Sequence, residues 1–456
     1  MSHDAPASFA SKQQTLDVLS DLIAKARKAG ADAADAIFVN GISLSHAQRL
    51  GKIEKLERSE GSDLGLRVFI GKRQAIVSSS DMSPHTLDEL VERVVAMART
   101  VPEDPYCGLA DPDQIFRGPV PDLEICDSYE PAPETLIERA SKAEEAARAV
   151  AGVTNSEGAE ASWGQTRVEL AATNGFTGGY SVSRQSIGVA VLAGEGTGME
   201  RDYEFSSAVF SEDLDDPATV GKSAGERAVK RLNPRKVGTQ KVPVVFDPRV
   251  SNGLLRHLAG AINGSAIARG TSFLKDSMGQ PILPAALSVI DDPQRKRGMA
   301  SKPFDAEGIA NKSIALVEGG VLKSWVLDLR SARQLGLTTT GRASRGTSAP
   351  PSPSTTNLYL PAGTITRDAL IAGIKAGFYV NELMGFGVNT VTGDYSRGAS
   401  GFWIENGAIA YPVSEVTIAG NLKDMFLNML PADDLEFRYA VNTPTVRIDG
   451  MTIAGN

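Results

Sequence analysis

The stretch of residues 242–272 constrains the fold of this chain more than any other. It opens with an apolar, β-branched run that is typical of a buried strand. Asp247 then offers an N-cap oxygen, and Pro248 takes the first helical position, where its missing N–H costs nothing because that donor would be unpaired anyway. Apolar residues recur on one helical face from 250 to 262. The sequence therefore predicts a strand that passes directly into one long helix, residues 248–268.

A second face of this helix is nearly bare. Gly253, His257, Gly260 and Gly264 follow one another at spacings of four, three and four residues, so they form one stripe. Each glycine costs a helix roughly 0.5–1 kcal/mol relative to alanine. Three of them indicate that something approaches this face closely, either a bound chain or a β-sheet of the same chain.

Several segments resemble the TldD/PmbA (TldE) family, whose members were first described as modulators of DNA gyrase. They keep the family's order and approximate spacing over essentially the whole chain: Thr173-Asn174-Gly175, Arg201-Asp202-Tyr203, Arg269-Gly270-Thr271-Ser272, 391–403 (VTGDYSRGASGFW), Glu405-Asn406-Gly407, Tyr411-Pro412-Val413, 417–425 (TIAGNLKDM) and Gly450-Met451-Thr452. One branch of the family carries an HExxxH metal-binding helix and is proteolytic, whereas the PmbA/TldE branch lacks this motif.

The resemblance places the three motif positions at about Leu255, Arg256 and Gly260, and none of these is a zinc ligand. The active branch also uses a cysteine near its C-terminus, but no cysteine follows Cys126 here. The chain therefore resembles the PmbA/TldE branch, and we expect neither catalytic residues nor a metal in it.

The resemblance implies a motif-lacking subunit of a heteromeric, cytosolic metallopeptidase that acts on unfolded peptides. A TldD-like partner would then hold zinc or a similar divalent metal, and this chain would be inactive by itself although it belongs to a family of proteolytic hydrolases. Two alternatives stay open. One is a homodimeric peptide-binding or scaffold protein without protease activity, and the other is an autonomous metallopeptidase with non-standard ligands such as His257 and nearby carboxylates.

Two places are candidates for contact with a peptide or a partner. The residues are Gly253, His257 and Gly264 on the helix, and Asp394, Tyr395 and Arg397 in the polar, glycine-flanked segment 393–398. In this segment the backbone could pair with an extended peptide and Arg397 could hold a carboxylate. Asp and Gly are equally expected in a turn of a β-rich domain, so a purely structural role is the alternative.

The other segments predict an α+β fold, with an α/β N-terminal region followed by a β-rich C-terminal domain that holds the glycine-striped helix. We place the domains at 1–110, 118–235 and 238–456, with a Pro- and Gly-rich linker at 102–121. Further helices are expected at 15–29, from 84 onward, and at 133–150, 217–232, 366–376 and 422–429. Strands are expected at 36–39, 42–48, 64–70, 74–78, 153–163, 166–173, 180–193, 199–210, 287–290, 313–317, 321–328, 401–405, 408–411 and 445–448. The stretch 338–356 is a long Ser/Thr/Pro/Gly loop, either functional or mobile.

Composition excludes several classes of function. The net charge of −8 argues against a nucleic-acid binder, because phosphate neutralisation needs clustered Lys and Arg. Cys107 and Cys126 are too few for a disulfide framework. The N-terminal segment is polar and no apolar run is long enough to span a bilayer, so we expect a cytoplasmic protein without signal peptide or membrane contact.

Other catalytic sites find no support in the residues. The histidines are His3, His46, His85 and His257, and no two are four or five residues apart. A G-x-S-x-G nucleophile elbow is absent. The glycines of 194–198 lie between two expected strands and no helix follows, so a hairpin connection is favoured over a phosphate loop.

Overall fold

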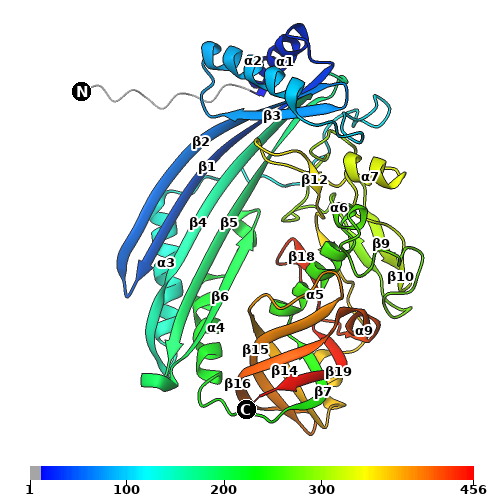
Figure 1. Ribbon diagram of the computed structural model, residues 1–456. Helices are drawn as coiled ribbons and strands as arrows, with labels where there is room; N and C mark the ends of the chain where they lie inside the picture. The colour runs from blue at the N-terminus through cyan, green and yellow to red at the C-terminus, as the bar shows by residue number, and fades with distance from the viewer. Residues whose placement is uncertain (1–11, 456) are drawn as a thin grey trace.

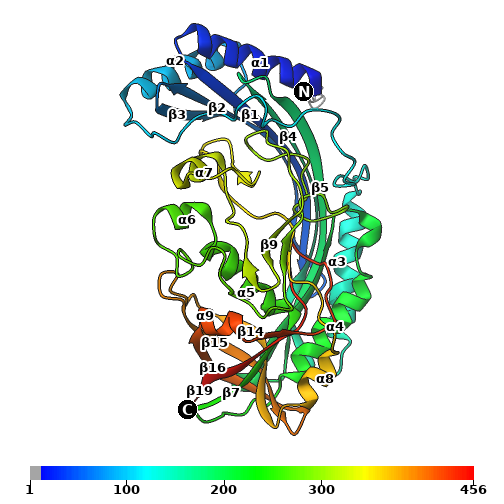
Figure 2. The same cartoon turned by 90° about the vertical axis from the view of Figure 1, so that its right-hand side faces the viewer.

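A computed structural model describes residues 12–455 of the chain, so His3 and the first eleven residues lie outside the described part. Figure 1 shows a long, curved sheet beside a C-terminal domain built around a small barrel. Figure 2 shows the C-terminal domain in the hollow of the sheet and two helices, α3 and α4, on its outer side. The predicted α+β fold with a β-rich C-terminal domain is confirmed.

The long sheet has six strands in the order β3-β2-β1-β4-β5-β6, and every neighbouring pair is antiparallel. Its strands are β1 (Ala33–Arg49), β2 (Lys52–Ile70), β3 (Arg73–Ser79), β4 (Val153–Ala172), β5 (Thr177–Ala193) and β6 (Glu200–Ala208). Single strands replace the two predicted pairs at 36–48 and 153–173, because β1 and β4 pair continuously through the glycines that separated the two members of each predicted pair. Strands from both sides of the 102–121 linker thus share one sheet.

Alternation along β1 assigns its two faces to different layers. Phe38 and Leu44 belong to the clusters formed with the helices, whereas Ile37 packs in a cluster with Phe304 of the C-terminal domain. The covering helices are α1 (Lys12–Lys28), α2 (Pro84–Thr100), α3 (Pro133–Arg148) and α4 (Pro217–Lys230). Two short 3-10 turns, η1 (Gly196–Gly198) and η2 (Ser211–Asp213), flank β6, and the connection at 194–198 joins β5 to β6 as a hairpin, as predicted.

Five strands of the C-terminal domain close a barrel in the order β16-β15-β14-β7-β19, because β16 also pairs with β19. The strands of this sheet are β7 (Gln240–Phe246), β14 (Ala376–Met384), β15 (Asp394–Glu405), β16 (Ala408–Asn421), β17 (Met429–Pro431) and β19 (Val446–Ala454). A second sheet contains β8 (Val289–Asp291), β9 (Ile314–Glu318), β10 (Val321–Leu322), β13 (Leu358–Tyr359) and β18 (Val441–Asn442), and β11 (Ala343–Ser344) pairs with β12 (Ser352–Pro353). The helices are α5 (Pro248–Ala261), α6 (Gly264–Ala268), α7 (Leu329–Leu335), α8 (Arg367–Ala372) and α9 (Leu422–Leu427).

The prediction of one helix over 248–268 is wrong. The chain leaves helical geometry at Ile262, whose carbonyl accepts a hydrogen bond from the Val326 N–H at 3.0 Å. Gly264 N–H donates to the Val326 carbonyl at 2.8 Å, and Asn263 caps the new helix α6. The predicted strand at 321–328 ends early for a related reason, because its last residues make this bridge and Asp328 then caps α7.

The 338–356 loop is held in place by buried ion pairs. The Arg342 side chain is completely buried against Asp291, which also accepts a hydrogen bond from the Thr356 N–H at 2.7 Å. Arg345 reaches the N-terminal sheet and pairs with Asp35 at 2.7 Å. The loop therefore connects the C-terminal domain to the long sheet. Among the described helices, none is long and apolar enough to cross a membrane.

Candidate functional site

The strand-to-helix unit forms as the sequence predicts. Asp247 follows β7 and its side chain accepts a hydrogen bond from the Arg249 N–H at 2.9 Å, which caps α5. The second carboxylate oxygen accepts from the hydroxyl of Tyr379, on the neighbouring strand β14, at 2.7 Å. These bonds fix the start of α5 against the barrel.

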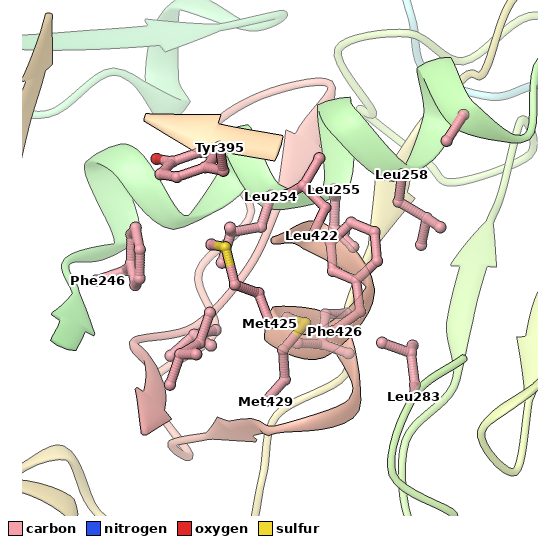
Figure 3. Packing of buried hydrophobic residues seen from close by; sticks show 14 of the residues in the cluster. Phe246, Leu254, Leu255, Leu258, Leu283, Tyr395, Leu422, Met425, Phe426 and Met429 are labelled. Carbon is pink, nitrogen blue, oxygen red and sulfur yellow. The ribbon is translucent and has the colours of Figure 1, made fainter. Parts of the chain in front are cut away.

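One face of α5 is the centre of the domain core. Leu254, Leu255 and Leu258 are each 1% exposed. They lie in one apolar cluster with Met425 and Phe426 of α9 (Figure 3). The position of α5 in the domain is therefore set by apolar packing along this face.

The motif positions that the resemblance assigns do not fit a metal. Leu255 points into the core, Arg256 is exposed and positively charged, and exposed Gly260 has no side chain. None of them supplies the nitrogen, sulfur or carboxylate donor that zinc requires. Among residues 12–455, no three His, Cys, Asp or Glu side chains group in a way that could hold a metal ion.

The glycine stripe is divided by the break at Ile262. A Cβ at Gly264 would come within 2.6 Å of both Leu327 Cδ2 and Ser331 Oγ, so here the same chain makes the close approach. At Gly253 and Gly260, no heavy atom of the described residues, apart from the local helix backbone, lies within 4 Å of such a Cβ. This part of α5 therefore leaves a bare strip of backbone open.

His257 and Tyr395 lie together beside this open strip. Their ring centroids are 5.9 Å apart in an edge-to-face arrangement. Partial burial lowers the pKa of His257, and the positive charge of Arg397 lowers it further. Burial raises the pKa of Tyr395, so both rings are neutral near pH 7. Tyr395 is 2% exposed, so only the half-buried ring of His257 is accessible next to the bare backbone.

The other residues of the 393–398 segment have structural partners. Asp394 accepts hydrogen bonds from Thr392 Oγ1 at 2.6 Å and from Asn421 Nδ2 at 3.1 Å. Arg397 Nε donates to the Met384 carbonyl at 3.1 Å. These bonds hold the connection between β14 and β15, which favours the structural interpretation of Asp394. Sequence reasoning missed Phe386 in the same connection, whose side chain is fully exposed at 101%.

A polar cavity of about 430 Å³ lies at the start of α5, between the central and C-terminal parts of the chain. Its arginines already have carboxylate partners: Arg249 pairs with Asp202 at 2.9 Å, and Arg227 pairs with Glu204 at 2.8 Å. The Arg249 guanidinium also lies 4.3 Å above the Tyr203 ring. The segment Arg201-Asp202-Tyr203, which is part of the resemblance, holds Arg249 through the Asp202 carboxylate and the Tyr203 ring.

A buried ionic cluster joins the two large parts of the molecule and carried no local signal in the sequence. Asp35 of β1 lies between Arg67 of β2 and Arg345 of the loop, and none of the three side chains is more than 4% exposed. Burial works to raise the pKa of Asp35, but the charges of Arg345 and Arg67 lower it overall. Burial and the neighbouring Asp305 raise the pKa of Glu307 to about 8.

Three family models match the chain in order. They describe PmbA/TldA metallopeptidase domain 1 over residues 34–98, the central domain over 126–232 and the C-terminal domain over 239–455. Together they span both the long sheet and the barrel domain.

Individual relatives agree with the family models. The metalloprotease PmbA of Escherichia coli O157:H7 is 38% identical over 426 residues, which are 93% of this chain and 92% of that protein. A crystal structure of a candidate modulator of DNA gyrase from Bacteroides thetaiotaomicron has a TM-score of 0.90 at 26% identity, over 98% of this chain and 100% of that one. TldE from Thermococcus kodakarensis has a TM-score of 0.86 at 20% identity, over 96% and 100%, which shows the fold alone. The chain therefore belongs to the PmbA/TldD metallopeptidase family.

Proposed function

We propose that this chain is the motif-lacking, TldE-like subunit of a heteromeric cytosolic metallopeptidase that acts on unfolded peptides. The observation that carries the proposal is the helix α5, whose metal-motif positions hold Leu255, Arg256 and Gly260 inside a fold that otherwise follows the family. A TldD-like partner would supply the metal and the chemistry of hydrolysis.

The open strip of α5 is the proposed surface for contact with the partner or the peptide. Gly253 and Gly260 allow another backbone to approach without a side chain in between, since no other part of residues 12–455 lies within 4 Å of a Cβ at either position. His257 adds a half-buried, neutral ring at the same place, edge-to-face against the buried ring of Tyr395. Phe386 offers an exposed apolar side chain on the β14–β15 connection. Arg397 donates to the carbonyl of Met384, where this connection begins, and so links the connection to this region.

Co-expression with the HExxxH-bearing relative from the same organism tests the proposal. We expect the two chains to purify as a complex, the metal to follow the relative in elemental analysis, and cleavage of a fluorogenic unfolded peptide to require both chains. One metal ion per chain together with cleavage by the present chain alone would refute the proposal.

Gly260→Leu tests the contact surface within the same complex. Gly260 is exposed, and no other part of the described chain lies within 4 Å of a Cβ placed there. Leucine also favours a helix more than glycine does, so the variant should fold normally. We expect at least a tenfold loss of affinity for the partner or of cleavage by the pair. Ala218→Leu, at an exposed position of α4, is the matched control and should change neither. Unchanged assembly and cleavage with Gly260→Leu would exclude this face.

A further inference from the structure

The outer edge of β2 is unpaired over more than half of its length. β3 pairs with β2 only at Leu64–Ile70. From Lys52 to Asp63, β2 has β1 on one side, and among the described strands none lies on the other. Figure 1 shows this edge on the side of the long sheet away from the C-terminal domain. Such an edge exposes unpaired N–H and C=O groups that can pair with another strand.

The side chains along this edge are exposed and alternate in charge. Every residue from 52 to 60 is exposed, including Ile53 at 60% and Leu56 at 48%. Lys55 and Glu57 lie 2.9 Å apart on one face of the strand, and Arg58 and Glu60 lie 2.7 Å apart on the other. Arg58 also pairs with Glu130 of the same chain at 2.5 Å, and the two apolar side chains stand partly exposed among these charges.

Symmetry limits how two copies of this edge can meet. In a two-fold antiparallel pair that continues the sheet, opposed residues point to the same face, so their numbers must be both even or both odd. The two-fold axis then passes between one residue and the same residue of the second copy, and we say that this residue is on the axis. The possible registers therefore differ in which residue occupies the axis.

The register with Leu56 on the axis is complementary in charge at every opposed charged position. Leu56 then faces Leu56, and the charged residues are opposed as follows: Lys55 with Glu57, Glu54 with Arg58, and Lys52 with Glu60. Each combination forms twice because of the two-fold symmetry. Opposite charges across a strand pair are favourable, whereas like charges are unfavourable.

The neighbouring registers lose this complementarity. With Lys55 on the axis, Lys52 would oppose Arg58. With Glu57 on the axis, Glu54 would oppose Glu60. Of these three registers, the charge pattern selects the one about Leu56.

The selected register also fits the space along the edge. The Leu50–Gly51 turn of the second copy would lie opposite Ser62 and Gly61 of the first. It stops short of β3, whose last residue, Ser79, pairs with Leu64. The free stretch of β2 is therefore long enough for this pairing and ends where the pairing ends.

We propose that β2 is a homodimerisation edge, at which the β2 strands of two copies pair antiparallel about Leu56 to form one continuous sheet. This surface lies on the N-terminal sheet and is separate from the open face of α5, so it does not depend on the proposed partnership. The same charges could instead serve to keep the edge unpaired, as lysines on edge strands do. That alternative predicts a monomer and is separated by experiment.

Charge exchange between two variants gives the sharpest test. Sedimentation velocity of the purified full chain should show concentration-dependent dimers that weaken with salt, because exposed ion pairs are screened. Lys55→Glu and Glu57→Lys should each weaken self-association on the order of 10- to 100-fold, since each places like charges opposite one another. A mixture of the two variants should dimerise again, because each copy then faces the complementary charge. This rescue cannot come from the intrachain Lys55–Glu57 contact, which both variants lose.

Symmetric cross-linking tests the register itself. Opposed residues in an antiparallel pair have Cα atoms about 4.5–5.5 Å apart, within the range of a disulfide. Leu56→Cys should therefore oxidise to a covalent dimer. Ile53→Cys is the matched control, because it opposes Ser59 and lies roughly 20 Å from its own copy. The unsubstituted chain, with its buried Cys107 and partly buried Cys126, gives the background.

Three results would overturn the proposal. They are a monomer at all accessible concentrations, a mixture of charge variants that associates no better than either alone, and cross-linking of Ile53→Cys as fast as Leu56→Cys. Circular dichroism should show that each variant is folded, because the substituted positions are exposed. Cross-linking of Leu56→Cys only to a TldD-like chain would also reject a second copy as the occupant.

Discussion

Gly253 and Gly264 come from the same predicted stripe, yet the structure predicts opposite effects of replacing them with alanine. At Gly264 the new Cβ would lie 2.6 Å from Leu327 Cδ2 and 2.9 Å from the Val326 carbonyl oxygen. That carbonyl cannot retreat freely, because it accepts the Gly264 N–H hydrogen bond at 2.8 Å. Overpacking of this kind lowers the free energy of unfolding by about 1–3 kcal/mol.

Gly253 lies inside α5, and beyond the backbone of this helix its new Cβ would meet no atom of residues 12–455 within 4 Å. Alanine is favoured over glycine in a helix by about 0.5–1 kcal/mol, so Gly253→Ala should stabilise the chain by that amount. The two variants should therefore differ by about 1.5–4 kcal/mol, the sum of the two effects.

Urea unfolding followed by tryptophan fluorescence measures this difference. Trp325 and Trp403 are both buried in the core that contains α5, so they report on the relevant domain. A Trp163→Phe background removes the signal from the N-terminal sheet and is common to both variants. A neutral Gly264→Ala, or a destabilising Gly253→Ala, would refute the assignment of packed and open parts of the stripe.

Two further predictions concern buried charges. Arg342→Met should lower the free energy of unfolding by about 3–5 kcal/mol, because it leaves Asp291 buried without its cation. The control is Arg330→Met, which breaks a partly exposed ion pair with Asp104. In the same urea assay it should lower the free energy of unfolding by about 1 kcal/mol or less. Glu307 has its pKa raised to about 8 in the folded chain, so its protonated form is favoured there. The contribution of Glu307 to the free energy of unfolding should therefore be fully present below its unfolded pKa of about 4.3. It should fall as pH rises toward 8, by up to roughly 1.4 kcal/mol per pH unit. Glu307→Gln should flatten this dependence in unfolding measured from pH 5 to 8, and an unchanged slope would contradict the assignment.

Local signals in the sequence predicted the local structure well. Asp247 and Pro248 mark the start of α5 because an N-cap oxygen and an N1 proline act within one turn. Asn174-Gly175 and Asn406-Gly407 form the predicted hairpins because their positive φ angles suit such turns: Asn406 at 51°, Gly175 at 92° and Gly407 at 82°. These features depend only on neighbouring residues.

The first half of β2 and the ionic cluster could not be predicted in this way. Residues 52–60 show no alternation of apolar and polar residues, since both faces of the strand are exposed. Asp35 and Arg345 are far apart in the chain and meet only when the loop docks on the long sheet. The break of the helix at Ile262 likewise depends on Val326, a distant residue that supplies the competing backbone bonds.

The packing of α5 connects the fold with the proposed role. The resemblance places Leu255 at about a ligand position of the metal-binding branch, and here Leu255 is 1% exposed within the core. The helix is thus held by apolar contacts along one face and needs no ligand for its place in the domain. On its other face, a Cβ at Gly253 or Gly260 would meet no other part of the described chain within 4 Å. Glycines weaken a helix, and these two do not serve internal packing, so the neighbouring chain proposed for that face would explain their presence.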